Sequence, residues 1–87
     1  MMIVIAYDIC IKEASGAKRL KNVATLGENY GRRVQNSVYE CIIDYDRYRA
    51  LKKEMADIIN KKTDHVRFYL LGNRYNDRIE TLGNSLE

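Results

Sequence analysis

The chain of 87 residues contains no proline, a single histidine and only two cysteines. The absence of proline favours short, regular connections between helices and strands. One histidine and two cysteines, without the close spacing of zinc ligands, exclude a structural zinc site of the usual type. Because no secretion signal is visible, we expect Cys10 and Cys41 to be reduced thiols of a cytoplasmic protein.

Long apolar runs are also missing. The longest covers residues 1–7, far short of the roughly 18 residues needed to cross a bilayer. We therefore expect neither a membrane span nor a signal peptide. Apolar residues make up 46% of the chain and charged residues 31%, which is typical of a folded globular domain. A chain this short buries only a small core, so a second copy would add apolar contact.

The net charge of +3 is unevenly distributed along the chain. Residues 11–35 contain six lysine and arginine residues against two glutamates, whereas residues 36–64 and 65–87 are each neutral. Such a concentration of positive charge indicates an anionic partner, with nucleic acid first among the candidates, and a solvated helix face is the alternative. Arginine can hold a phosphate through two hydrogen bonds. The candidate phosphate-binding residues are Lys18, Arg19, Lys21 and Arg33.

Two stretches have the residue spacing of amphipathic helices. The first begins at Ser15-Gly16 and ends near Gly31, since glycine commonly follows the last residue of a helix. The second follows Asp44 or Asp46, either of which can cap it. Its apolar stripe consists of Tyr48, Leu51, Met55, Ile58 and Ile59.

Continuous or alternating apolar residues predict the strands. Residues 2–7 are typical of a strand buried on both faces, and two short strands flank a turn near Asn36-Ser37. A fourth strand is expected at residues 65–71 and a weak terminal strand within residues 77–83. The order strand, helix, strand, strand, helix, strand is that of the ferredoxin-like fold. We therefore predict one α+β domain over residues 1–83, a βαββαβ sandwich with an antiparallel sheet and an extra C-terminal strand, and a tail at residues 84–87.

The first strand also predicts a partner surface. In the ferredoxin-like fold both helices cover one face of the sheet and leave the other face bare. Because the first strand is apolar on both faces, the bare face should also be buried, most simply against a second copy in a two-fold homodimer. The terminal strand would otherwise be an exposed edge, so we expect it to extend the partner's sheet.

Asp8 follows the first apolar run and is the main candidate for catalysis. Alternation places it on the same face as Val4 and Ala6, the face expected to meet a second copy. Two copies of Asp8 could then approach each other and hold one Mg²⁺, which takes one or two carboxylates together with waters. A turn-forming or helix-capping aspartate is the alternative. Tyr7 is expected in the core, with its hydroxyl near the site.

The other ionisable residues fit a catalytic role less well. Asp64 lies at the expected end of an element and is interpreted as a cap. His65 begins a strand and is interpreted as a surface histidine rather than a base. Asp57 falls on the polar side of a helix and is interpreted as solvated.

Four motifs in this order resemble the CRISPR-associated protein Cas2 family. The first two are Tyr7-Asp8 at the end of the first strand and residues 16–20, GAKRL, at the start of the helix. The others are residues 33–40, RVQNSVYE, and residues 66–72, VRFYLLG, followed by a terminal strand that ends at Gly83. The resemblance covers residues 3–83.

The resemblance implies a ferredoxin-like homodimer with one Mg²⁺ held between the two Asp8 side chains. It implies a role in the spacer-acquisition stage of antiviral immunity, in which the dimer bridges two dimers of the integrase Cas1 and supports captured duplex DNA. Some members are assigned metal-dependent endonuclease activity on single-stranded RNA or duplex DNA, and others act as scaffolds. Tyr7, Ser37 and Tyr39 lie in the matching motifs as supporting residues. Many members have phenylalanine in place of Tyr39 and arginine in place of Lys18.

Two functions of different classes follow from these residues. In the first, paired Asp8 residues and Mg²⁺ hydrolyse phosphodiesters, slowly because no dedicated base accompanies them. In the second, the basic residues clamp a duplex while the terminal strand docks the integrase. A third alternative is the virulence-associated toxin D ribonucleases, which share the fold. Residues 33–40 and the basic stretch argue against that family.

Overall fold

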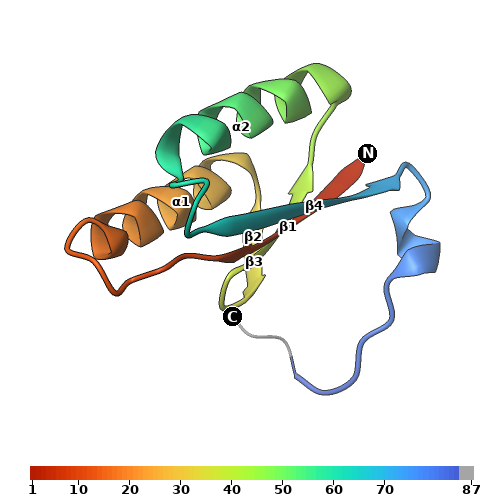
Figure 1. The fold of residues 1–87 in the computed structure, drawn as a ribbon. Helices are drawn as coiled ribbons and strands as arrows, with labels where there is room; N and C mark the ends of the chain where they lie inside the picture. Colours follow the sequence, from red (N-terminus) through yellow and green to blue (C-terminus); the bar gives the residue numbers. More distant parts are fainter. Residues whose placement is uncertain (85–87) are drawn as a thin grey trace.

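Residues 1–84 are described by the structure, a computed structural model of the chain. Residues 85–87, which belong to the expected tail at 84–87, lie outside the described residues. Two helices lie on one side of a four-stranded sheet, and the other side of the sheet carries no helix of comparable length (Figure 1). Neither of these two helices has the length and hydrophobicity needed to cross a membrane, and no other helix of residues 1–84 has them.

The strands and helices alternate as the sequence predicted. Strand β1 (Met2–Asp8) leads into helix α1 (Gly16–Tyr30), which is followed by β2 (Arg32–Gln35) and β3 (Val38–Ile42). The remaining elements are α2 (Tyr45–Ile58), β4 (His65–Gly72) and a short 3-10 helix, η1 (Tyr75–Arg78). The strands are hydrogen-bonded in the order β2-β3-β1-β4, and all neighbouring pairs are antiparallel. This is the ferredoxin-like arrangement.

The ends of the two long helices agree with the predicted caps. Ser15 is the N-cap of α1, and the N–H of Gly31, just after the helix, donates to the carbonyl of Gly27 at 2.8 Å. Helix α2 begins after Asp44, whose carboxylate accepts a hydrogen bond from the backbone N–H of Arg47 at 2.8 Å. The cap of α2 is therefore the first of the two aspartates that the sequence offered.

The core lies between the helices and one face of the sheet. Ile3 and Ile5 of β1 and Tyr39 and Cys41 of β3 are fully buried there. A Cβ atom at Gly27 would lie 2.8 Å from the Tyr39 ring, so α1 can approach the sheet this closely only because residue 27 has no side chain. Both cysteines are free thiols. Burial raises the pKa of the Cys41 thiol to about 11, which keeps it protonated and unreactive.

The opposite face of the sheet is uncovered, as predicted. Val4, Ala6 and Asp8 of β1 lie on this face, next to their cross-strand partners from β3 and β4. Large apolar side chains are exposed there, with Ile42 of β3 64% exposed and Tyr69 of β4 44% exposed. A single chain therefore leaves large apolar side chains of this face open to solvent. We call it the uncovered face.

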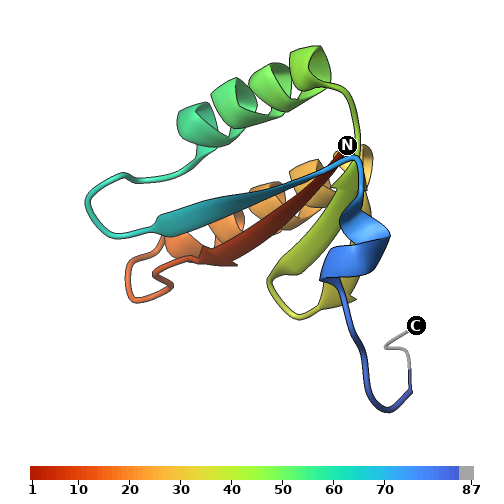
Figure 2. The ribbon, with the colours of Figure 1, turned by 90° about the vertical axis from the view of Figure 1, so that its right-hand side faces the viewer.

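The terminal strand expected within residues 77–83 is not formed in the single chain. Tyr75–Arg78 form η1 instead, and residues 79–84 run past the sheet without pairing with another strand (Figure 2). Gly72, with a φ of 77°, turns the chain at the end of β4 as predicted. Because β4 pairs only with β1 among the described strands, its outer edge is open. Pairing of residues 79–84 with a second copy remains a prediction.

Candidate functional site

Asp8 is the last residue of β1 and lies on the uncovered face. The alternation that turns Ile3 and Ile5 into the core turns Asp8 outward, and its side chain is exposed. Across residues 1–84 no group forms a side-chain hydrogen bond or an ion pair with its carboxylate. A capping or turn-forming aspartate would accept a hydrogen bond from a nearby backbone N–H, so these alternatives do not describe Asp8.

His65, the first residue of β4, is the cross-strand partner of Asp8. Directly opposed side chains of antiparallel neighbours share a face, with Cβ atoms about 5 Å apart. His65 is exposed, as the sequence indicated, but its place beside Asp8 was not foreseen. This neighbourhood follows from the register of β1 against β4. The residue pattern of each strand alone does not reveal that register.

A single chain offers few ligands for a metal ion at this position. No three histidine, cysteine or carboxylate side chains come together anywhere in residues 1–84. Mg²⁺ prefers oxygen ligands and takes one or two carboxylates along with several waters. One exposed carboxylate is therefore a weak site, whereas two copies of Asp8 facing each other would match the preference of the ion. The donor set fits Mg²⁺ only in a dimer.

Tyr7, Ser37 and Tyr39 support the end of β1. The N–H of Tyr7 donates to the carbonyl of Ser37 at 3.1 Å and joins β1 to the turn between β2 and β3. Ser37 has a φ of 70°, a conformation that costs a residue with a side chain about 1 kcal/mol. The rings of Tyr7 and Tyr39 are stacked with their centroids 6.2 Å apart. These contacts fix the backbone directly before Asp8.

The surroundings of the Tyr39 hydroxyl disfavour its ionisation. It donates a hydrogen bond to a carboxylate oxygen of Glu28 at 3.3 Å. Burial, together with the nearby Tyr7 hydroxyl and Glu28 carboxylate, raises the pKa of Tyr39 to about 12. The hydroxyl therefore stays protonated at neutral pH, and the contribution of Tyr39 is to packing.

Asp64, which directly precedes β4, has a side chain that is 0% exposed. Its Oδ1 accepts a hydrogen bond from the N–H of Cys10, and its Oδ2 accepts from the N–H of Asn60 and from Nε of Arg19, each at 2.9 Å. Burial alone would raise the pKa of Asp64, but these hydrogen bonds outweigh it and lower the pKa to about 2. The sequence interpretation of Asp64 as a cap is therefore incomplete, because the carboxylate also joins the distant Cys10 and Arg19 to the turn at residues 60–64.

Arg19, one of the candidate phosphate ligands, turns inward toward this carboxylate in the single chain. Its Nη2 donates to Oε1 of Glu13 at 2.9 Å and to the carbonyl of Cys10 at 3.2 Å, and its Nη1 donates to Oγ of Ser15 at 2.6 Å. The hydrogen bond to Asp64 raises the pKa of Arg19. The side chain is only 13% exposed. The guanidinium is therefore not a free surface cation in the single chain, and its contact with phosphate stays a prediction.

The other three candidate phosphate ligands are accessible. Lys18 and Lys21 are exposed on α1, whose first turn follows Asp8 after a short loop. Arg33 is exposed on the edge strand β2 and is separated from β1 by β3. Lys12, in the loop between β1 and α1, adds a further exposed positive charge. The accessible basic residues therefore lie on three separate elements, the loop after β1, helix α1 and strand β2, rather than in one pocket.

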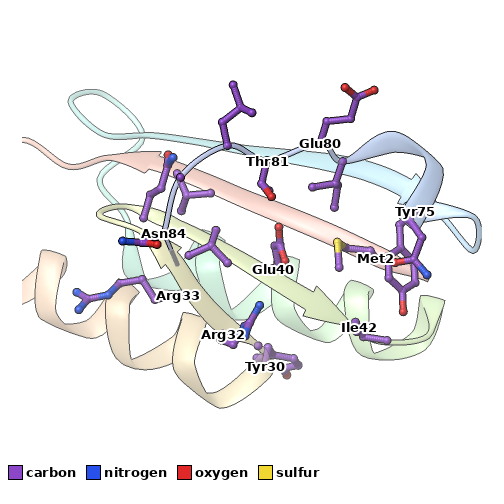
Figure 3. A pocket seen from close by; sticks show the side chains of 18 residues that line it. Met2, Tyr30, Arg32, Arg33, Glu40, Ile42, Tyr75, Glu80, Thr81 and Asn84 are labelled. Carbon is purple, nitrogen blue, oxygen red and sulfur yellow. The ribbon is translucent and has the colours of Figure 1, made fainter. Parts of the chain in front are cut away.

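An open groove of about 1230 Å³ lies beside the C-terminal segment and does not include Asp8. Figure 3 shows it between β2 and β3 on one side and the C-terminal segment on the other. Val38 and Ile42 supply apolar lining, and Arg32 and Glu40 supply charge. The width of the groove follows from the unpaired course of residues 79–84. It is a gap beside an unpaired segment and not an enclosed ligand pocket.

Comparison with known proteins gives consistent results. The model of the family described as CRISPR associated protein Cas2 matches residues 1–79. A protein of Halalkalibacterium halodurans named CRISPR-associated endonuclease Cas2 is 43% identical over 83 residues, which are 95% of this chain and 86% of that protein. A protein of Nitratidesulfovibrio vulgaris named CRISPR-associated endoribonuclease Cas2 is 35% identical over 95% of this chain and 81% of its own length. The crystal structure of Streptococcus pyogenes Cas2 at pH 6.5 has a TM-score of 0.82 and 46% identity, covering 95% of this chain and 100% of that one.

Proposed function

The chain belongs to the CRISPR-associated protein Cas2 family, and we propose that it is a metal-dependent endonuclease that acts as a two-fold homodimer. The observation that carries this proposal is the exposed carboxylate of Asp8 at the end of β1, on the uncovered face. The names of the relatives, endonuclease and endoribonuclease, support phosphodiester hydrolysis as the reaction. Family membership also removes the toxin D ribonucleases from the alternatives.

A second copy of the chain completes the proposed site. The uncovered face offers Val4, Ile42 and Tyr69 as apolar contacts that no element of the same chain covers. If two chains join through this face, a two-fold axis between their β1 strands brings one Asp8 toward the other. Residues 79–84 could then add a strand to the open edge of the partner's β4. This pairing would account for an extended segment that has no strand partner within one chain.

Each residue of the site has a distinct task in the proposed reaction. Mg²⁺ bound between the two Asp8 carboxylates would lower the pKa of a bound water and offset the negative charge of the phosphodiester. Lys18, Lys21 and Arg33 would hold neighbouring phosphates and align the strand. The substrate is single-stranded RNA or duplex DNA, recognised through its backbone. With no dedicated base beside Asp8, cleavage should be slow.

A scaffold role in the same defence system is the second proposal. It is favoured by the exposed lysines of α1 and by the unpaired residues 79–84. In this role the dimer bridges two dimers of the integrase Cas1 in the cytoplasm during spacer acquisition. Lys18, Lys21 and Arg33 would contact the duplex backbone, and the C-terminal segment would dock the integrase. Asp8 would then be dispensable.

A cleavage assay separates the two proposals. Single-stranded RNA and duplex DNA are incubated with wild type, Asp8→Ala and Asp57→Ala, each with Mg²⁺ and with chelator. Asp57 is a matched control because it is an exposed carboxylate on α2, away from the uncovered face. The endonuclease proposal predicts Mg²⁺-dependent cleavage that falls at least about 100-fold in Asp8→Ala and is unchanged in Asp57→Ala. Equal activity of wild type and Asp8→Ala would leave only the scaffold role.

A further inference from the structure

A buried ion pair lies directly behind the Asp8 site. The Asp64 carboxylate connects the loop after β1, helix α1 and the segment after α2 through Cys10, Arg19 and Asn60. Thr63 adds a hydroxyl hydrogen bond to Oδ1 of Asp64 at 3.3 Å. Among residues 1–84 no other carboxylate combines full burial with this many hydrogen bonds. We call Asp64 and Arg19 the clamp.

The clamp restrains the chain just after Asp8 and just before His65, at one end of the sheet. Cys10, two residues after Asp8, is fixed at its N–H by Asp64 and at its carbonyl by Arg19, which donates at 3.2 Å. Asp64 itself immediately precedes His65, the cross-strand partner of Asp8. One carboxylate therefore restrains both segments at the point where β1 ends and β4 begins.

The start of α1 packs closely against the loop that follows β1. A Cβ atom at Gly16 would lie 2.2 Å from the carbonyl oxygen of Cys10, so the helix begins in contact with the loop only because residue 16 is glycine. Arg19 then reaches back over this loop from the first turn of α1. The exit of the chain from β1 is thus fixed by packing as well as by hydrogen bonds.

Stability alone is a weak reason for a charged pair in this position. Replacing a buried ion pair with apolar residues of similar volume often leaves a protein equally stable or more stable. Directed hydrogen bonds to backbone groups, in contrast, set positions that apolar packing does not specify. Hydrogen-bond partners of a metal ligand commonly change metal affinity by 10- to 100-fold when they are removed. Residues that fix the backbone next to a ligand act on the same geometry from one step further away.

We propose that Asp64, acting with Arg19, is a positioning residue of the Asp8 centre. It fixes the loop after β1 against the start of β4 and so sets the position and direction of the Asp8 carboxylate. This inference rests on the proposed function, because it assigns to the clamp an effect on metal binding at Asp8. It adds a buried charged residue to a site whose candidate metal ligand, Asp8, is exposed.

Metal affinity tests this role without relying on activity. Mn²⁺, used as the probe, is titrated into wild type, Asp64→Asn and Arg19→Lys, and free Mn²⁺ is measured by electron paramagnetic resonance. Asp64→Asn keeps the shape of the side chain and removes its charge, whereas Arg19→Lys keeps the charge and removes the branched guanidinium. Leu51→Ala is the matched control, because Leu51 is fully buried in α2 and lies outside the clamp. Circular dichroism and light scattering select a temperature and concentration at which all variants are folded and equally associated.

The expected result is a Kd for Mn²⁺ that is about tenfold or more higher in both clamp variants and near the wild-type value in Leu51→Ala. If Asp64→Asn does not fold, Arg19→Lys decides the outcome alone. Wild-type affinity in the folded clamp variants, or an equal loss in Leu51→Ala, would overturn the positioning role and leave the Asp8 site intact. Undiminished Mn²⁺ binding by Asp8→Ala in the same series would overturn the proposed site, and the positioning role with it.

Discussion

The two faces of the sheet differ in how far a single chain completes them. On the face toward the helices, Ile3 and Ile5 are 0% exposed, whereas on the uncovered face Ile42 is 64% exposed and Tyr69 is 44% exposed. Strand β1 supplies apolar residues to both faces and ends in Asp8 on the uncovered one. The covered face therefore supplies the core that stabilises the single domain. The uncovered face is available for association with a second copy and carries the candidate catalytic residue.

Truncating a core side chain that packs between the helices and the covered face should have the largest effect on stability. Leu51→Ala should lower the free energy of unfolding by about 3 kcal/mol, because a fully buried leucine leaves a cavity. Ile42→Ala, on the uncovered face, should change it by about 0.5 kcal/mol or less in protein dilute enough to be monomeric. Urea denaturation of both variants provides the measurement. Equal losses in dilute protein would contradict the distinction between the faces.

A charge on the uncovered face should break association and leave the fold intact. Val4→Asp places a carboxylate in the surface proposed to join two copies, where it would be buried without a partner. We expect the dimer Kd to rise at least about 100-fold, equivalent to about 2.7 kcal/mol, with an unchanged circular dichroism spectrum. Ala56→Asp, on the exposed side of α2, is the control and should associate like wild type. Sedimentation equilibrium would refute the proposed interface if Val4→Asp also associated normally.

Overpacking tests how tightly the covered face is filled. Gly27→Ala would place a Cβ atom 2.8 Å from the Tyr39 ring, so the ring or the helix has to move. We expect a loss of about 2 kcal/mol in the free energy of unfolding. Asn22→Ala, at an exposed position of the same helix, should be neutral or slightly stabilising. Thermal unfolding compares them, and an unchanged melting temperature in Gly27→Ala would show that the contact yields easily.

The smallest expected effect appears only in acid. Burial alone would raise the pKa of Asp64, but its hydrogen bonds lower the pKa from the ordinary 3.8 to about 2. The unfolded chain therefore binds the proton more readily, so the contribution to stability is complete above about pH 4 and is lost as pH falls toward 2. Asp64→Asn should flatten the dependence of the urea midpoint on pH over this range. Asp57→Asn should leave it unchanged, and an equally steep dependence in Asp64→Asn would contradict the assigned pKa.

Features set by local burial were predicted correctly from the sequence. The apolar residues 2–7 predicted a strand with apolar side chains on both faces, because successive side chains of a strand point to opposite faces. Helix α1 ends before Gly31, because glycine favours the end of a helix, and α2 begins after Asp44, because aspartate favours its start. The positions of Asp8 and of the exposed Lys18 follow from these elements.

Features set by contacts between distant segments were not predicted. Arg19 and Asp64 are 45 residues apart, and a basic residue at the edge of a helix has the same sequence pattern whether it meets solvent or a buried acid. The place of His65 beside Asp8 depends on strand register in the same way. The terminal strand is absent from the single chain for a related reason. A segment with strand-forming residues needs a neighbouring strand, and residues 79–84 have none within one chain.

One Mg²⁺ shared by two copies of Asp8 is the most specific property proposed for this protein, and its stoichiometry can be measured directly. Isothermal titration of the purified dimer, with Mn²⁺ as the probe, gives the number of ions bound per chain. The shared site predicts one ion for every two chains, with no binding at this site in Asp8→Ala. One ion for every chain, or the same binding in wild type and Asp8→Ala, would contradict a metal centre shared across the uncovered face.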